Sequence, residues 1–290
     1  MKLIYRPDID GLRCIAVIAV IFYHAQISIS GNLIFTGGYI GVDIFFVISG
    51  YLITAIILNE LFTTGKFSYF KFYERRVRRI IPVLLVVMLA SLYLAWILLL
   101  PDKFISFIKS IFYSLGFVSN IFFYNIGQEY AAQSSLFIPL LHTWSLSLEI
   151  QYYILFPLLL FFSFKFFKKY LFVILVIFFI SSLLFADFFS NKNNTSAFYF
   201  IHTRIWEFLL GSFLSYFDIN FSKKKVISKK NNFFTILGAF LVTFSIIYFD
   251  HKTYHPSILT LIPLLGICLI IWFSNKDDII TKILSTKFFV

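Results

Sequence analysis

Six ionisable residues stand inside strongly apolar stretches of the sequence, and their types are those that carry proton transfer and anion binding. They are Arg13, His24, Asp43, Glu149, Arg204 and Glu207. A charged or titratable side chain at such a position is costly unless it faces a polar cavity or a partner. We therefore treat the histidine and the carboxylates as candidates for acid or base chemistry and the arginines as candidates for anion binding.

The first two of these residues, Arg13 and His24, are eleven positions apart. On an α-helix this offset returns to within about 20° of the same face and separates the two residues by roughly 16 Å along the axis. We expect both to line one groove, in which a long anionic molecule reaches from a fixed cation at the cytoplasmic mouth to a base deeper in the membrane. A histidine that only hydrogen-bonds a neighbouring helix is the structural alternative.

A dense arginine cluster opens a later apolar stretch just before Pro82, with Arg75, Arg76, Arg78 and Arg79. Several guanidinium groups within one turn can hold phosphates by bidentate hydrogen bonds. Plain anchoring at the cytoplasmic face is the alternative, because Lys and Arg accumulate there in membrane proteins. Glu149 is a second candidate acid or base, and a buried carboxylate paired with an arginine is its structural alternative.

The sequence lacks the Gly-x-Ser-x-Gly, His-Glu-x-x-His and Cys-x-x-Cys motifs. Serine-based covalent catalysis and metal-dependent hydrolysis therefore have no support, and we expect neither a metal site nor a permanently bound cofactor. The two cysteines, Cys14 and Cys268, lie inside apolar runs and are expected to be packing residues.

The composition identifies the elements that must position these side chains. Of 290 residues, 60% are hydrophobic and 13% charged, which excludes a cytosolic enzyme, a disordered tail and a nucleic-acid-binding domain. The net charge of +11 comes from short basic clusters between apolar runs, as in cytoplasmic loops of membrane proteins. We therefore expect a lipid bilayer, and no nucleic acid, as partner.

Nine stretches are long and apolar enough to approach the roughly 20 residues that a spanning helix needs. They lie near 12–31, 38–58, 80–100, 104–124, 143–163, 170–189, 199–217, 233–250 and 257–273.

We expect the N-terminus and the basic segments 66–79 and 222–232 to be cytoplasmic. This orientation allows only one net crossing of the membrane between 104 and 163, although two apolar stretches lie there. One of them should be re-entrant, and we favour an irregular region within 120–148. The prediction is an all-α polytopic membrane protein with about 8–9 transmembrane or re-entrant helices in one bundle, formed by a single domain over residues 1–290.

Five ordered motifs give the chain a resemblance to the acyltransferase-3 family, the bacterial membrane O-acyltransferases of the O-antigen acetylase type. The motifs are Tyr5-Arg6-Pro7-Asp8-Ile9-Asp10-Gly11-Leu12-Arg13 with Phe22-Tyr23-His24-Ala25, the tract 41–53, the tract 72–82, the tract 142–153, and His202-Thr203-Arg204-Ile205-Trp206-Glu207 with Leu210-Gly211. They extend over essentially the whole chain.

The resemblance implies transfer of an acyl group, usually acetyl, from cytoplasmic acetyl-CoA to a hydroxyl of an envelope glycan such as lipopolysaccharide O-antigen. It implies that His24 is the catalytic base, directly or through an acyl-enzyme relay, with Arg13 as its companion at the donor entrance. Arg76 and Arg79 match the Arg-x-x-Arg pair of the family, which implies contact with the phosphates of CoA. Glu149 matches the acidic residue of the Ser-x-Glu tract.

The resemblance also implies a bacterial inner membrane location, acyl-CoA as the donor substrate, and an envelope glycan or lipid-linked saccharide as the acceptor. A separate extracytoplasmic transferase is a further expected partner. Relatives continue past the tract matching 283–290 into two more helices, so the chain is expected to be C-terminally incomplete and to lack their extracytoplasmic esterase-like domain. A transporter or channel, and an inactive truncated acyltransferase, remain the alternatives.

Overall fold

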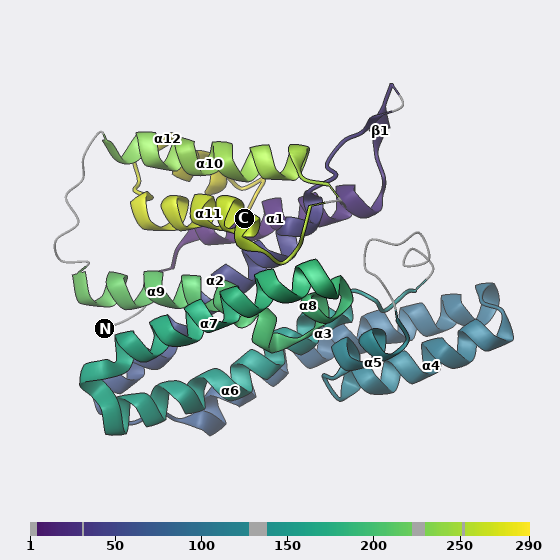
Figure 1. The fold of residues 1–290 in the computed structure, drawn as a ribbon, viewed down its shortest axis with the longest axis horizontal. Coiled ribbons are helices and arrows are strands. Elements are labelled where there is room, and N and C mark those ends of the chain that lie inside the picture. The colour runs from purple at the N-terminus through teal and green to yellow at the C-terminus, as the bar shows by residue number, and fades with distance from the viewer. Residues whose placement is uncertain (1–4, 31, 128–137, 222–229, 251–252) are drawn as a thin grey trace.

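Helices form nearly all the regular structure in the computed structural model, which describes residues 5–30, 32–127, 138–221, 230–250 and 253–290. Within these ranges the only strands are two short antiparallel ones, β1 (Ser28–Ile29) and β2 (Asn32–Leu33). The long helices run side by side, close to the long axis of the molecule (Figure 1). The all-α prediction is confirmed, apart from this two-residue strand pair.

The described helices are α1 (Pro7–His24), α2 (Gly41–Thr64), α3 (Tyr69–Leu98), α4 (Pro101–Leu115), α5 (Ser119–Asn125), α6 (Thr143–Phe167), α7 (Leu171–Lys192), α8 (Asn194–Tyr199), α9 (Ile205–Phe221), α10 (Lys230–Tyr248), α11 (Leu261–Phe273) and α12 (Ile279–Leu284). Short 3₁₀ turns lie at Gly38–Ile40, Lys168–Tyr170, Ile201–Thr203 and Ile258–Thr260.

Three segments are long and apolar enough to cross a membrane: Gly38–Thr64, Tyr69–Leu98 and Thr143–Lys192. The last of these contains both α6 and α7. Shorter apolar helices cover Asn232–Tyr248 and Ile258–Phe273. Large apolar side chains are exposed along α3, α6, α7 and α10, as lipid-facing surfaces require. The chain is an integral membrane protein, while the predicted number of crossings stays a prediction.

Helix α2 occupies the centre of the bundle and is buried over most of its length. It runs parallel to α9 at very short range, since a Cβ atom on Gly50 would lie 1.9 Å from the carbonyl oxygen of Phe208. A Cβ atom on Gly211 would lie 1.9 Å from the carbonyl oxygen of Val47. Small residues permit such close backbone contact between membrane helices. The two glycines therefore fix the helix pair that supports the rest of the bundle.

The ends of α2 and α6 and the start of α3 lie together, as aromatic contacts show. The Phe62 and Phe164 rings are 5.6 Å apart, and the Tyr69 and Phe161 rings 6.1 Å apart. We call this the basic end, because it carries Lys66, Lys71, Arg75, Arg76, Arg78, Arg79, Lys165, Lys168 and Lys169. The starts of α2 and α6 lie at the opposite end. Gathering of cations at one end is the pattern expected of a cytoplasmic face.

Several predicted spans differ from the observed helices: α3 begins at Tyr69 instead of near residue 80, α9 begins at Ile205 instead of near residue 199, and two other spans end early or are divided. Helix α1 ends at His24 instead of near residue 31, because the chain turns at Gln26, whose φ is +49°, into the strand pair. The stretch 104–124 is divided into α4 and α5 by a turn at 116–118, where Phe117 has a φ of +54°.

At about 1.5 Å per residue, α4 is roughly 22 Å long and too short to span the bilayer. Helix α6 is continuous over its 25 residues. The irregularity therefore begins earlier than the predicted 120–148. The positions 128–137 within that range lie outside the described residues, as do 222–229 of the second predicted basic segment.

Candidate active site

A cavity of about 380 Å³ lies between α1, α2 and the start of α6. Its walls are mostly apolar side chains of α1 and α2, among them Val17, Val20 and Phe46. The polar groups come from the start of α6, with His142 near one end and Glu149 two turns along the helix. A largely apolar cavity with few polar groups is the usual form of a ligand site.

Arg13 and His24 lie on the same face of α1 as the cavity wall. Arg13 is one turn before Val17 and His24 one turn after Val20, and residues four apart on a helix are neighbours. Both positions belong to the continuous helix α1, but neither Arg13 nor His24 is among the residues that line the cavity, so a groove lined by both stays a prediction. Arg13 is half-buried, and its Nη1 atom is 2.9 Å from Asp10 Oδ1.

The depth of Arg13 differs from the prediction of a cation at the mouth. At the start of α1, Arg6 donates a hydrogen bond of 3.1 Å to the Tyr51 hydroxyl, which lies near the middle of α2. Helix α1 runs antiparallel to α2 from there, because Gly41 packs on the Ala16 carbonyl. The thirteen residues from Tyr51 to the end of α2 correspond to roughly 20 Å. Arg13 therefore lies well inside the bundle.

His24 is held by its own helix in a form suited to accept a proton. Its Nδ1 atom donates to the Val20 carbonyl at 2.8 Å, because a carbonyl oxygen can only accept. A neutral ring that donates from Nδ1 has its basic lone pair on Nε2.

His142 is the electrostatic neighbour of His24. The side chain of His142 is accessible to solvent, but the protein packed around the ring removes part of its hydration and lowers its pKa. Positive charge on His24 lowers the pKa of His142 further. The two imidazoles therefore resist being protonated together.

Glu149 accepts hydrogen bonds from two side chains, the Ser49 hydroxyl of α2 and the Tyr153 hydroxyl one turn along α6. Among the described residues Glu149 makes no salt bridge, so direct pairing with an arginine is not what holds it. Arg76 interacts with Glu149 electrostatically without forming a salt bridge, and Arg76 Cζ lies 5.5 Å from the centroid of the Tyr153 ring. Glu149 thus links the cavity to the arginine cluster.

The four clustered arginines have different surroundings. Arg76 is half-buried between the rings of Phe72 and Tyr153, and its Nε atom has no hydrogen-bond partner in the described part of the chain. Arg79, one turn further along α3, is exposed. Arg78 is also exposed and pairs with Glu74 at 2.7 Å. Of the predicted pair, only Arg76 faces the Glu149 region.

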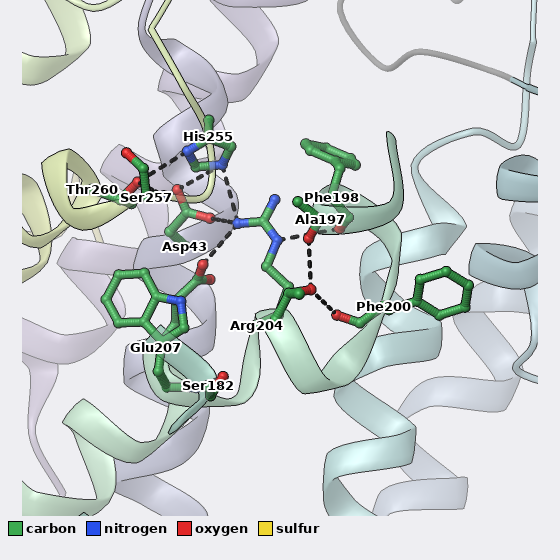
Figure 2. Close-up of polar contacts among 12 residues, drawn as sticks. Asp43, Ser182, Ala197, Phe198, Phe200, Arg204, Glu207, His255, Ser257 and Thr260 are labelled. Atoms are coloured by element: carbon green, nitrogen blue, oxygen red, sulfur yellow. Dashed lines mark hydrogen bonds and ion pairs between the residues drawn. The ribbon is translucent and has the colours of Figure 1, made fainter. Parts of the chain in front are cut away.

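Asp43, Arg204 and Glu207 meet in a buried ion cluster together with His255, and all four side chains point toward one another (Figure 2). Arg204 Nη1 is 2.8 Å from Asp43 Oδ1, 2.8 Å from Glu207 Oε1 and 3.1 Å from His255 Nε2. Paired in this way, buried charges avoid the cost of isolated ones. The cluster accounts for three of the six intramembrane ionisable residues as partners of one another.

His255 contacts two members of the cluster through one atom, since its Nε2 lies 3.1 Å from Arg204 Nη1 and 3.4 Å from Asp43 Oδ2. Its Nε2 accepts from Arg204, so Nδ1 carries the proton and donates to the Thr260 hydroxyl at 3.2 Å. Burial, followed by the positive charge of Arg204, lowers the pKa of His255 well below its usual value. The ring therefore joins the loop before α11 to the starts of α2 and α9.

Sequence reasoning assigned no role to Ser49, His142, Tyr153 or His255. The first three lie inside the quoted motif tracts, so their presence was visible but their contacts were not. His255 stands in a short polar loop, where a histidine is unremarkable until Arg204 is seen beside it. Pairings across such sequence distances require the fold.

A family model described as an acyltransferase domain matches residues 6–287. The chain belongs to this family. The "O-acetyltransferase OatA" of Staphylococcus aureus strain NCTC 8325 / PS 47 is 35% identical over 231 residues, which cover 78% of this chain and 37% of that protein. The protein named OatA in strain COL matches to the same extent. The "Putative O-acetyltransferase SAS0844" of strain MSSA476 is 42% identical over 159 residues, or 55% of this chain and 25% of that protein.

The matched region thus spans little more than a third of the OatA proteins. No solved structure matches the chain. The family resemblance carried by the five sequence motifs is confirmed.

Proposed function

We propose that this chain is a membrane O-acyltransferase that moves an acyl group, acetyl by preference, from cytoplasmic acyl-CoA to a hydroxyl of an envelope glycan. The observation that carries the proposal is the cavity between α1, α2 and α6, which is lined by His142 and Glu149, with His24 close enough to His142 to lower its pKa. Membership of the acyltransferase family supports the reaction class. The O-acetyltransferase names of the relatives support acetyl as the group transferred.

In this proposal the donor enters from the basic end. Arg76 and Arg79 hold the phosphates of acyl-CoA, because guanidinium groups bind phosphate oxygens in pairs. The pantetheine arm then passes the Tyr153 and Glu149 side chains into the cavity. Arg13, deep in the bundle, supplies positive charge beside the arm. The thioester thereby approaches the α1 face that carries His24.

His24 acts as the general base. Its Nε2 takes the proton of the acceptor hydroxyl while the oxygen attacks the thioester carbonyl. The carbon–sulfur bond breaks, and CoA leaves as a thiol with the proton that His24 held. His142 favours this role, because it remains neutral beside His24 and leaves room for one positive charge in the pair.

Glu149 stabilises the site between donor entrance and base. Held by Ser49 and Tyr153, it is the acid that the Ser-x-Glu tract contributes. The Tyr153 side chain, which Glu149 holds, packs against Arg76 and can orient it. An oxygen of Glu149 can also accept a hydrogen bond from the donor arm. A fixed carboxylate of this kind supplies positioning as well as charge.

The charge distribution supports the proposed location. The basic end faces the cytoplasm of a bacterial inner membrane, and the cavity end with His24 lies toward the other face. The acceptor is lipopolysaccharide O-antigen, another surface polysaccharide or a lipid-linked saccharide. A separate extracytoplasmic transferase would carry the group onward.

The decisive experiment compares His24→Gln with His202→Gln, which changes an exposed histidine outside the cavity. Each variant is expressed in cells lacking the gene, its membrane abundance is measured, and envelope polysaccharides are examined by mass spectrometry. We expect the acetyl mass increment to fall at least 100-fold in His24→Gln, since general bases contribute about 10²–10⁴ in rate. His202→Gln should retain it.

Wild-type acetylation by His24→Gln at equal abundance would disprove the role of His24. A different result would favour the alternative. If the wild type adds no acetyl group, and Arg76→Ala binds acyl-CoA with the same affinity as the wild type, the protein would be a transporter or channel.

A further inference from the structure

A second cavity, of about 590 Å³, lies at the basic end between the end of α2, the start of α3 and the end of α6. Its walls are formed mainly by the aromatic side chains Phe67, Tyr69, Phe161 and Phe164, and by Lys66 and Lys165. The proposed donor path uses none of these residues. Arg76, the half-buried cation of that path, lies about 10 Å further along α3.

The two lysines give this cavity a positive charge that its surroundings do not neutralise by ion pairing. The salt bridges found within the described ranges involve neither Lys66 nor Lys165. The nearby carboxylate of Glu60 accepts a hydrogen bond of 2.9 Å from the Ser68 backbone amide. Lys165 Nζ lies 5.3 Å from the centroid of the Phe166 ring, and its stem lies along the aromatic wall. An anionic group is the complementary ligand.

The position of the cavity identifies the kind of anion. Two spanning segments end or begin here, at Thr64 and Tyr69, and α6 ends here as well, so the cavity lies at the depth where headgroups meet acyl chains. Exposed aromatic side chains adjoin its lining residues: Phe62 contacts Phe164, and Phe70, Phe162 and Phe166 are next in sequence to Tyr69, Phe161 and Lys165. A ligand there must present negative charge to the lysines and hydrocarbon to the aromatic rings.

We propose that this cavity binds an anionic phospholipid, with the headgroup phosphate between Lys66 and Lys165 and the acyl chains along the exposed rings of Phe162 and Phe166. An amphipathic anion satisfies both features, whereas a soluble nucleotide would leave the surrounding aromatic surface unused. The site is separate from the transfer reaction, and its test does not depend on activity.

Native mass spectrometry of the detergent-purified chain tests the proposal with phosphatidylglycerol and phosphatidylcholine of identical acyl chains. We expect the wild-type chain to retain one phosphatidylglycerol in preference to phosphatidylcholine. The double variant Lys66→Gln/Lys165→Gln should weaken phosphatidylglycerol retention by roughly 25-fold, because each lysine beside an anionic headgroup contributes a factor of about five.

Lys276→Gln/Lys287→Gln, which removes the same charge from two exposed lysines away from the cavity, is the matched control and should remain within a factor of about two. An equal loss in both double variants, or equal retention of the two lipids by the wild type, would overturn the proposal. Displacement of phosphatidylglycerol by free CoA, seen in the wild type and absent in Lys66→Gln/Lys165→Gln, would assign the cavity to the nucleotide instead.

Discussion

At the residue scale, neighbouring members of one motif have different environments. Arg76 packs between two aromatic rings with its Nε atom unpaired among the described residues, while Arg79 is exposed. A guanidinium that is already ordered and partly dehydrated loses less conformational freedom on binding a phosphate than an exposed one does. It therefore contributes more binding free energy. The two arginines should therefore contribute unequally to donor binding.

We predict that Arg76→Gln weakens acyl-CoA binding by about 10-fold or more, the loss expected for a charged hydrogen bond, and that Arg79→Gln weakens it only a few-fold. Isothermal titration of the purified chain with CoA measures both. Equal effects of the two substitutions would show that the orientation of Arg76 is unimportant.

Tyr153 supports Glu149 through a single hydroxyl. Tyr153→Phe leaves Glu149 with Ser49 as its remaining donor, so we expect a loss of about 1 kcal/mol in the free energy of unfolding. Thermal unfolding in detergent measures it, and Tyr170→Phe at an exposed position serves as the control. If both variants unfold at the wild-type temperature, the hydroxyl contributes nothing to stability.

The sequence correctly predicted that Arg13 and His24 belong to one helix, since that relation depends only on local apolar composition. The contacts of Glu149, Arg76 and His255 join residues far apart in the sequence. Arg76 and Arg79 have the same residue type and occupy the same motif, and the rings of Phe72 and Tyr153 beside Arg76 distinguish them. Such differences arise from packing between helices, which periodicity does not contain.

At the element scale, the contact between α2 and α9 depends on the absence of two side chains. At Gly50 and Gly211 the facing carbonyl oxygens lie where a Cβ atom would be. Both contacts are with backbone, which cannot rotate away as a side chain could. The helices must separate if either glycine is enlarged.

We predict that Gly211→Ala lowers the free energy of unfolding by about 1–3 kcal/mol or more, the cost of overpacking a core. Gly116→Ala is the matched control, because its added Cβ would meet no atom closer than 3.5 Å. Chemical denaturation in detergent compares the two variants. Equal stability of Gly211→Ala and the wild type would mean that α2 and α9 can move apart freely.

Helix boundaries were predicted less well than helix existence. Apolar composition located most spans, but it did not reveal the turn at 116–118 that separates α4 from α5. Phe117 takes a left-handed backbone conformation there although it is not glycine. A turn formed by apolar residues carries no compositional signal, so 104–124 was read as one stretch.

At the scale of the whole molecule, the buried ion cluster makes stability depend on pH. Neutral His255 accepts from Arg204 in the folded chain, where burial lowers its pKa, whereas the unfolded chain has a pKa near 6.5. Above about pH 6.5 neither state binds a proton, and the contribution is complete. Below that pH the unfolded chain takes up the proton first, so stability falls as the solution becomes more acidic.

We predict that between about pH 7.5 and 5.5 His255 lowers the free energy of unfolding by at most about 1.4 kcal/mol per pH unit. His255→Gln keeps an oxygen that can accept from Arg204 and removes this titration, so chemical denaturation in detergent should show that acid lowers its stability less than that of the wild type. A variant curve parallel to that of the wild type would show that other groups cause the acid sensitivity.

The same cluster determines the order in which the chain can mature. Asp43 and Arg204 are 161 residues apart, and synthesis proceeds from the N-terminus. The ribosome therefore delivers α2, with a bare carboxylate near its start, long before the guanidinium that neutralises it exists. Until α9 emerges, Asp43 lacks this partner, so the ion cluster that joins α2 to α9 can form only late in synthesis.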